Sequence, residues 1–555
     1  MAQKGPWLGL WLSLAALLVG LFIHRNASMG DAPSTSHDHT ECRHAKLSTS
    51  ESKGDWCPKQ PEPLSRGLDW NPADSDDDRS QAYERLAGAV RIRTETFESM
   101  PTDASDPQFD QFYVFEAYLR ATFPAVHAKL QLEHVNVHGL LYTWQGSSPE
   151  LKPIVLMAHQ DVVPVNPATE SQWEHPPYSA HLDADGWIWG RGTTDMKSTL
   201  IGILAAAEKL LAEGFQPERT ALFSFGFDEE VEGERGGKAL AAVVLERYGP
   251  QGVSLIIDEG FTGVSNDFGR EFARVGLTEK GYLTVQMSVA MPGGHSSKPP
   301  THTAIGITGQ LFAAMEASPG PVRLDESNPF FAYLECAAKY GDMDEGMAKR
   351  LNCPDCWPAL GQELAKDPDM AVFLRTTQAI TVVNGGIKEN ALPETVTSLT
   401  NYRTVFFETT QVVLDRLVAA ITPVARAHNL TLDAFGTHPD VQQNVIRLKT
   451  VGPVSEPAPT TPHDGPAFEL VAGTLRHLFP KSVVVPSAMT ALTDTVWYHG
   501  SSKHIYRFTP AYFEHLIGFH TVNERIHIDA HLSTIRFFYK LMRNSVGWAT
   551  DRKDS

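Results

Sequence analysis

Three short apolar segments, each leading into histidine or acidic residues, constrain the fold of this 555-residue chain most strongly. They are PIVLMAH up to His159, TALFSFGF before Asp228 and VSLIID up to Asp258, and a long helical segment, MKSTLIGILAAAEKLLAEG, separates the first two. Short apolar runs that alternate with helices are typical of buried strands in an α/β sheet covered by helices on both faces. Ligand-binding groups gather at the carboxyl ends of such strands. We therefore expect the residues at the ends of the three runs to form one site.

The pattern changes between about residues 279 and 455. Half-exposed strands alternate here with amphipathic helices: the strands are YLTVQMSVAM, AITVVNGG, TVTSLTNYRTV and a short one at TLDAF, and the helices are THTAIGITGQLFAAMEA and QVVLDRLVAAITPVARAHN. This order predicts a small α+β sandwich, with residues 318–377 as an insertion in it. We expect a catalytic domain with a mostly parallel sheet in two parts, 81–278 and 456–547, which is split by an inserted lid domain at 279–455 and followed by a tail at 548–555.

An uncharged apolar stretch, WLGLWLSLAALLVGLFI, occupies residues 7–23. Its length is at the lower edge of the ~17–25 residues that a helix needs to span a bilayer. We expect a transmembrane signal anchor there, preceded by a short tail at 1–6. A cleaved signal peptide and a buried helix are the alternatives.

Residues 24–80 are rich in Ser, Asp, Pro and His and show no sustained apolar period, which predicts a stalk. Their SHDHTECRH stretch is either a solvated linker or a metal-binding tract, and the run from Asp74 to Asp78 is typical of solvated charge. Asn26-Ala27-Ser28 and Asn429-Leu430-Thr431 fit the N-glycosylation pattern. With the anchor, they predict a glycoprotein of the secretory pathway whose body is lumenal.

Cysteine usage argues against a disulfide-rich scaffold, and net charge argues against a nucleic-acid-binding protein. Five cysteines are too few for a disulfide scaffold, although Cys42 could pair with Cys57 in an oxidising lumen. Cys353 and Cys356 form a CxxC that could close a tight disulfide or act in redox chemistry, but no thioredoxin-like pattern surrounds them. The 47 basic and 66 acidic residues give a formal charge of −19, which argues against nucleic acid as a partner.

Histidine and acidic residues at the predicted strand ends form the candidate site. They are His159-Gln160-Asp161, Asp195 in GRGTTDMK, Asp228-Glu229-Glu230 and Asp258-Glu259, with His520 in GFHTVNERI far downstream. A single strand-end aspartate is more often a helix cap than a ligand. The whole set offers imidazole and carboxylate ligands without a thiolate, which suits a pair of divalent ions such as zinc.

The segments MAHQDVVPV, WGRGTTDMKS, FDEEVEG, IDEG, PGGHSS, ENALP and HTVNERI occur in this order along the chain. In their residues and their order they resemble the motifs of the M20 family of dinuclear zinc exopeptidases, and most closely those of its fungal vacuolar carboxypeptidase S (Gly-X carboxypeptidase) group. The resemblance covers roughly residues 80–547. It implies two zinc ions per subunit and a vacuolar location.

The resemblance also implies roles for the residues of the candidate site. The implied metal ligands are Asp195 as a bridge, His159 and Asp258 on one ion, and Glu230 and His520 on the other. Glu229 would act as general base. Asp161 would accept the second N–H of His159 and so orient the ring.

Further residues of the resemblance lie in the lid and near the C-terminal part of the chain. His295 resembles a lid histidine that stabilises the oxyanion, often across a dimer interface, which implies a homodimer through the lid. Asn390 and Arg403 resemble residues that hold the terminal carboxylate of the substrate. Thr493 and Asp494 resemble residues near the substrate pocket. A satisfied core histidine and a surface ion pair are the alternatives for His295 and Arg403.

The sequence therefore predicts an anchored, lumenal metallocarboxypeptidase that hydrolyses the C-terminal peptide bond of short peptides. An N-acyl-amino-acid hydrolase or synthase would use the same site, because its substrate also carries a free carboxylate. A catalytically silent lumenal binding protein is the alternative from another class. An unchanged turnover in Glu229→Ala would favour that alternative.

Overall fold

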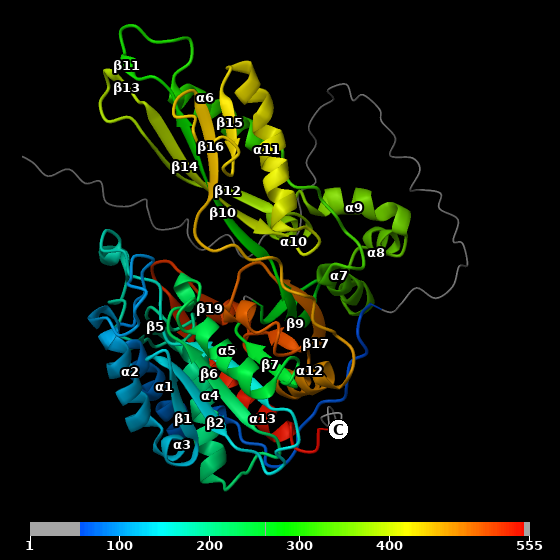
Figure 1. Ribbon diagram of the computed structural model, residues 1–555. Helices are drawn as coiled ribbons and strands as arrows, with labels where there is room; N and C mark the ends of the chain where they lie inside the picture. Colours follow the sequence, from blue (N-terminus) through cyan, green and yellow to red (C-terminus); the bar gives the residue numbers. More distant parts are fainter. Residues whose placement is uncertain (1–55, 261, 549–555) are drawn as a thin grey trace, which may run out of the picture. The chain divides into compact units, whose positions relative to one another are not determined.

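The computed structural model describes residues 56–260 and 262–548 (Figure 1). The predicted anchor, the sequon at Asn26, the histidine-rich tract with Cys42, and the predicted tail from residue 549 onward lie outside these residues. Within the described ranges, no helix combines the length and the apolar character that crossing a membrane requires.

A nine-stranded sheet forms the centre of the catalytic domain, in the order β1-β2-β6-β3-β7-β18-β9-β17, with β8 paired to β9. The three predicted apolar segments form β3, β6 and β7, which are buried along their whole length. From β6 to β18 neighbouring strands are parallel, whereas β1, β2 and β8 join by antiparallel pairing. The sheet is thus parallel at its centre and mixed toward its edges. The bounds are β1 Gln131–Val135, β2 Gly139–Trp144, β3 Ile154–His159, β6 Ala221–Gly226, β7 Leu255–Asp258, β8 Val264–Asp267, β9 Arg270–Glu279, β17 Val483–Met489 and β18 Ile505–Arg507.

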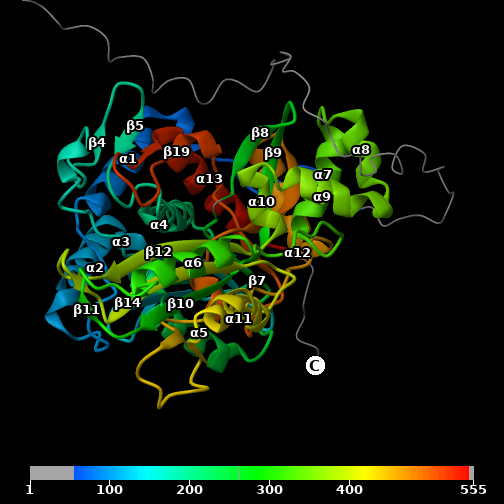
Figure 2. The ribbon, with the colours of Figure 1, turned by 90° about the horizontal axis from the view of Figure 1, so that it is seen from above.

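Helices cover both faces of this sheet, because successive side chains of a buried strand point to opposite sides. Leu156 of β3 lies in one core with Leu200 of α4, whereas its neighbour Val155 lies in another core with Val244 of α5. Helices α4 and α13 pack side by side (Figure 2). The helix bounds are α1 Asp76–Val90, α2 Asp110–Thr122, α3 Pro124–Lys129, α4 Lys197–Ala212, α5 Gly237–Tyr248, α12 Pro466–Leu478 and α13 Ile528–Asn544.

A small four-stranded sheet, β19-β20-β5-β4, joins two distant parts of the catalytic domain. Its strands are β4 His181–Leu182, β5 Trp187–Trp189, β19 Leu516–Ile517 and β20 Arg525–His527. The antiparallel pairing of β20 with β5 places the segment that holds His520 beside the segment that leads to Asp195.

The lid has a five-stranded sheet, β12-β14-β10-β16-β15, which shares one hydrophobic core with α6 and α11 (Figure 1). The predicted sandwich of a sheet and two helices is therefore confirmed, with β16 as an additional strand that the sequence pattern did not indicate. A separate strand pair, β11 and β13, forms what we call the lid tip. The bounds are β10 Gly281–Ala290, β11 Gly294–His295, α6 Ala304–Glu316, β12 Thr377–Gly385, β13 Ala391–Leu392, β14 Thr395–Thr404, α11 Thr410–Ala427, β15 Thr431–Ala434 and β16 Val445–Thr450.

The insertion predicted at 318–377 is helical and packs on the catalytic sheet. Phe331 and Leu334 of α7 share a core with Phe272 of β9 and Val485 of β17. The helices are α7 Pro329–Tyr340, α8 Glu345–Leu351, α9 Trp357–Leu364 and α10 Pro368–Leu374. By its contacts the insertion belongs to the catalytic body, although it is inserted in the lid sequence.

Residues 56–80 belong to the packed body, whereas their polar composition predicted a stalk. Cys57 forms a disulfide with Cys336 of α7 and not with Cys42. The buried Lys540 ammonium donates hydrogen bonds to the Ser65 hydroxyl and to the Arg66 and Leu68 carbonyl groups. The acidic run begins α1, where carboxylates are stabilised by the helix dipole.

The chain enters and leaves the lid at two neighbouring points. It enters between Glu279 and Gly281, and it returns near Ser455. The main chains of Tyr282 and Ser455 exchange two hydrogen bonds of 2.9 and 3.0 Å, and the Ala458 N–H donates to the Glu279 carbonyl. We call residues 279–282 and 455–458 the hinge.

Candidate metal centre

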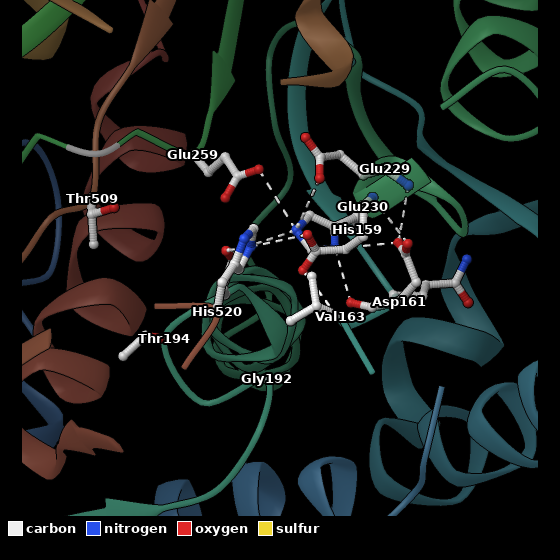
Figure 3. A network of polar contacts seen from close by, with 12 residues as sticks. His159, Asp161, Val163, Gly192, Thr194, Glu229, Glu230, Glu259, Thr509 and His520 are labelled. Atoms are coloured by element: carbon white, nitrogen blue, oxygen red, sulfur yellow. Dashed lines mark hydrogen bonds and ion pairs between the residues drawn. The ribbon is translucent and has the colours of Figure 1, made fainter. Parts of the chain in front are cut away.

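His159 ends β3 and is 1% exposed. Its Nε2 lies 3.1 Å from Asp195 Oδ1 and 3.6 Å from Glu259 Oε1. Its Nδ1 lies 3.0 Å from the main-chain oxygen of Asp161 and 3.3 Å from Asp161 Oδ1. Asp161 therefore holds one ring nitrogen and leaves the other facing the acidic cluster (Figure 3).

Asp195 lies between two histidines from opposite ends of the catalytic domain. Its Oδ1 faces His159, and its Oδ2 lies 2.9 Å from His520 Nε2. The same nitrogen of His520 lies 3.0 Å from Glu230 Oε2. Each oxygen of this carboxylate thus has its own histidine, as a ligand shared by two ions requires.

Two groups of ligand atoms have the spacing of a metal site. One consists of His159, Glu229 and Glu259, and the other of His159, Asp195 and Glu230; within each group the ligand atoms lie within 4.8 Å of one another.

Asp258, the predicted ligand, is in neither group. It is 4% exposed, and its charge interacts with Glu279, His159 and Arg507. Adjacent side chains of an extended segment point to different sides. The structure therefore brings Glu259 to the cluster beside Asp258, whose role as a ligand stays a prediction.

The carboxylates of the cluster repel one another in a buried environment. Burial, followed by the charge of Asp195, raises the pKa of Glu230 to about 7. Burial and the neighbouring acids also raise the pKa values of Glu229 and Glu259 well above their ordinary range. Burial acts to raise the pKa of Asp195 too, but hydrogen bonds to His159 and His520 outweigh it and lower this pKa.

Such a concentration of buried negative charge is stabilised by a cation. Imidazole nitrogens and carboxylate oxygens are also the ligand types that zinc and similar divalent ions take in proteins. The residues therefore fit a divalent metal centre.

Asp161 also positions the turn that carries the two glutamates. Its Oδ1 accepts a hydrogen bond from the Glu229 N–H, and its Oδ2 accepts one from the Glu230 N–H, both at 3.1 Å. The Thr96 hydroxyl donates to the same Oδ2 at 2.7 Å. One buried carboxylate thus connects the first histidine to the Glu229-Glu230 turn.

Asp494 packs against the glycines that flank this turn. It is 6% exposed, and a Cβ atom on Gly226, Gly233 or Gly237 would collide with its carboxylate oxygens. The three glycines allow the loop to close over the acid.

Thr493 is 3% exposed, and its hydroxyl donates to Glu279 Oε1 at 2.6 Å beside the hinge. The side chains of Thr493 and Asp494 are therefore buried next to the hinge and the Glu229-Glu230 turn, respectively. This burial does not favour their predicted contact with substrate, which stays a prediction.

Glu524 is a supporting residue that sequence reasoning missed. It is fully buried, and its Oε1 accepts hydrogen bonds from the Gly192 N–H, the Thr194 N–H and the Thr194 hydroxyl at 2.9–3.0 Å. Its Oε2 pairs with Arg191 at 2.5 Å. Glu524 thus holds the loop that carries Asp195. The available signal was an acidic residue within HTVNERI, four positions after the predicted ligand His520.

Arg403 is the lid residue that the structure brings toward the cluster. It lies on β14, with its guanidinium 4.7 Å from the centre of the Tyr282 ring. Burial lowers the pKa of Arg403, and interactions with Tyr282, Glu232 and Glu229 oppose this shift. The Glu229 interaction places this cation within electrostatic reach of the candidate general base.

His295 and Asn390 are exposed at the lid tip. His295 Nδ1 lies 2.8 Å from the Ser297 hydroxyl oxygen, and the main-chain oxygen of Asn390 accepts a hydrogen bond from the Ser296 N–H. The cross-strand pair His295–Ala391 keeps the two residues close together. The structure thus groups these two predicted residues with each other, on a surface of the lid.

An α/β body with an inserted lid, and a buried imidazole–carboxylate cluster at its strand ends, are typical of metal-dependent hydrolases. Residues 155–544 match the family model described as peptidase family M20/M25/M40, and the chain belongs to this family of peptidases.

Two relatives illustrate the range of named activities among similar proteins. The chain is 38% identical over 486 residues to carboxypeptidase S of Saccharomyces cerevisiae, which covers 84% of each chain. It is 32% identical over 489 residues to the N-fatty-acyl-amino acid synthase/hydrolase PM20D1 of Mus musculus, which covers 85% of this chain and 89% of the relative.

Solved structures share the fold at lower identity. The M20 family metallo-carboxypeptidase Sso-CP2 of Sulfolobus solfataricus superposes with a TM-score of 0.59 at 18% identity, covering 84% of this chain and 99% of that one. The di-peptidase Dug1p of Saccharomyces cerevisiae gives the same TM-score at 14% identity, covering 85% and 97%. At these identities the likeness establishes the common fold.

Proposed function

We propose that this protein is a zinc-dependent carboxypeptidase that hydrolyses the C-terminal peptide bond of short peptides. The observation that carries the proposal is Asp195, whose two oxygens face His159 and His520. A carboxylate in this position would be able to hold two divalent ions, one on each oxygen. The similarity to a relative named carboxypeptidase S supports the choice of bond.

The proposed ligands are drawn from the cluster. His159 and Asp195 would hold one ion together with a carboxylate of the Asp258-Glu259 pair, for which Glu259 is the nearer group. Asp195, Glu230 and His520 would hold the other. When bound, the ions supply Lewis acidity, which polarises the scissile carbonyl and lowers the pKa of a water molecule.

Glu229 would move the protons of the reaction. Its carboxylate is 14% exposed, and its Oε2 lies 3.9 Å from His159 Nε2, next to the proposed metal position. It would accept a proton from the attacking water and return it to the leaving nitrogen. Arg403 would bind the terminal carboxylate of the substrate, for which a planar guanidinium fork is suited.

We further propose that the lid completes the site across a homodimer. His295 is exposed at the lid tip, and strand β12 forms an edge of the lid sheet. Residues 381–390 at this edge are all exposed, including Val382, Val383 and Ile387. An exposed apolar edge strand is suited to pairing with a second copy. His295 and Asn390 of one subunit would then serve the site of the other.

Hydrolysis or synthesis of N-acyl amino acids is the second candidate function. It is favoured by the similarity to the synthase/hydrolase of Mus musculus, and it would use the same Arg403 for the free carboxylate. The two functions differ on the acyl side of the scissile bond, where an acyl chain replaces a peptide.

A membrane-anchored, lumenal location in the vacuole is also proposed, from residues 7–23 and the resemblance described above. The Cys57–Cys336 disulfide supports an oxidising compartment. The exposed side chain of Asn429 is accessible for glycosylation.

The test uses the purified full chain with a blocked Gly-Leu dipeptide and a long-chain N-acyl leucine as substrates. We expect zinc in the protein, loss of activity after chelation, and faster release of leucine from the dipeptide. Glu229→Gln should lower kcat by about 10²–10⁴-fold with the metal content unchanged. The matched control is Glu234→Gln, a nearby exposed acid. Faster cleavage of the acyl substrate would replace the peptide proposal, and full activity of metal-free protein or of Glu229→Gln would refute the mechanism.

The same metal analysis separates the two neighbouring acids. Glu259→Gln should lose bound metal, whereas Asp258→Asn should retain more of it. The reverse result would support Asp258 as the ligand, as the sequence predicts.

A further inference from the structure

None of the functions proposed above uses Cys353 or Cys356. The two cysteines lie in the helical insertion, between the end of α8 and the start of α9 (Figure 1). Their CxxC spacing leaves two alternatives, a tight disulfide and a redox-active thiol pair. Redox-active pairs of this spacing are found next to a strand–helix unit, whereas residues 329–374 form helices and turns without a strand. This setting favours a structural bond.

The main chain around the two cysteines forms a tight turn. The Cys353 N–H donates to the Arg350 carbonyl at 3.1 Å, and the Cys356 N–H donates to the Cys353 carbonyl at 2.8 Å. Pro354 begins a short 3₁₀ helix after Cys353, and its ring fixes one backbone angle. In a 3₁₀ turn the side chains at positions i and i+3 lie one above the other. The backbone therefore places the two side chains together, whether or not a bond joins them.

The sulfur atoms of Cys353 and Cys356 lie 2.7 Å apart. Heavy atoms that are in contact but not bonded are normally about 3.5–4.0 Å apart. The two sulfur atoms of a disulfide are about 2.05 Å apart. The contact is thus closer than two separate thiol groups favour, and a small movement of the side chains is enough for a bond.

Other contacts hold α8 against α9 across the same turn. The guanidinium of Arg350 on α8 donates two hydrogen bonds to the Glu363 carboxylate on α9. The Trp357 indole N–H donates to the Leu351 carbonyl at 2.7 Å. A disulfide stabilises a fold when it fits the native geometry and fails to do so when it distorts that geometry. A bond at this turn would join two helix ends that are already held together.

The same insertion carries a disulfide in another place. Cys336 of α7 is bonded to Cys57, and such bonds persist in oxidising compartments. Cys353 is half-buried, so a reactant from the solvent can reach its sulfur, whereas Cys356 is 3% exposed. The outer cysteine of the pair is therefore suited to react first.

We propose that Cys353 and Cys356 form a second disulfide, which joins the end of α8 to the start of α9. The bond forms by exchange with a small-molecule or protein disulfide. The Cys353 thiolate attacks one sulfur of this reactant, which gives a mixed disulfide and releases one thiol. The Cys356 thiolate then attacks the Cys353 sulfur and releases the second thiol. In all, the two cysteines give up two electrons and two protons, and the reactant takes them up.

The two disulfides should differ in how readily a reductant opens them. Cys57 and Cys336 are 1% and 0% exposed, whereas Cys353 is half-buried. Thiol–disulfide exchange needs access to the sulfur that is attacked. We expect mild reduction of the folded protein to open Cys353–Cys356 first and to leave Cys57–Cys336 intact.

The test is peptide mapping by mass spectrometry of the full chain, purified without reductant. The protein is denatured, blocked with iodoacetamide and digested. We expect the peptide that holds both cysteines to carry no blocking group and to be lighter by two hydrogen atoms than the dithiol form. After reduction it should take up two blocking groups. A peptide in which both cysteines are blocked, or in which either is joined to Cys42, overturns the proposal.

Cys353→Ser is the matched control, because it removes one sulfur and keeps a side chain of similar size. In this variant Cys356 should carry one blocking group. The main measurement uses the unsubstituted chain, so it stands even if the variant folds poorly. In a time course of mild reduction, opening of Cys57–Cys336 before Cys353–Cys356 would overturn the expected order. None of these outcomes bears on the proposed hydrolysis, which is measured separately.

Discussion

The metal centre and the lid tip differ sharply in how completely one chain determines them. At the metal centre, His159, Asp161 and Asp195 are at most 5% exposed and hydrogen-bonded to one another or to the loops beside them. At the lid tip, His295 and Asn390 are exposed, and their bonds stay within the two short strands and their flanks. The comparison teaches that contacts within one subunit hold the residues of the proposed metal centre, whereas His295 and Asn390 lie apart from them on the lid surface. On our proposal, a second subunit brings these two lid residues to the site.

The largest effect should come from removing the charge beneath Asp195. Glu524→Gln leaves Arg191 buried without its partner, which costs about 3–5 kcal/mol, and it loosens the Gly192–Asp195 loop. We expect a lower unfolding midpoint in denaturant and weaker metal binding. Glu514→Gln, an exposed acid in the same region, should change neither. Unchanged metal affinity in Glu524→Gln would show that the centre does not need this support.

The next effect concerns the lid tip. His295→Ala should lower kcat by about 10²–10³-fold, the usual cost of losing one oxyanion donor, without changing the unfolding midpoint. A histidine-to-alanine substitution at a proposed metal ligand, such as His159, should by contrast lower the metal content as well as kcat.

Mixing two inactive variants sharpens this prediction. His295→Ala retains its metal centre, and Glu229→Gln retains its lid. Co-expressed in equal amounts, they should recover about a quarter of the wild-type activity, because half of the dimers are mixed and each has one complete site. No recovery would mean that each lid serves its own subunit. Dimerisation would then not explain why the lid-tip residues lie apart from the metal centre.

The smallest expected effects are changes in stability when one glycine of each region is replaced by alanine. In Gly237→Ala the new methyl group meets the Asp494 carboxylate beneath the Glu229-Glu230 turn, which should cost about 1–3 kcal/mol. Gly309→Ala, in α6 of the lid, meets nothing within 4 Å and should stabilise the helix by about 0.5–1 kcal/mol. Denaturant unfolding of both variants measures the difference. Equal effects would contradict the tight packing under the metal centre.

Much of the catalytic body could be predicted, because its signals are local in the sequence. The apolar runs that became β3, β6 and β7 are continuous, His159 ends the first of them, and Asp195 lies in a distinctive motif just before α4. The approach of Glu259 to His159 could not be predicted, since it depends on how the backbone turns after β7.

Residues 56–80 were misread for a different physical reason. Their partners, Cys336 and Lys540, are hundreds of positions away, so the local polar composition carried no sign of burial. The role of Glu524 was missed in the same way, because its hydrogen bonds join residues more than 300 positions apart. The lid sandwich was recognisable by its alternating strands, because this pattern is local in the sequence.

The late position of His520 and Glu524 in the chain has a consequence for biosynthesis. His159 and Asp195 are made long before the segment that supplies the second histidine and the support of the Asp195 loop. Domains fold progressively as the chain is made, from the N-terminal side. A nascent chain that has not reached residue 524 therefore lacks both His520 and the support of the Asp195 loop, and the proposed centre is completed only after that segment has been made.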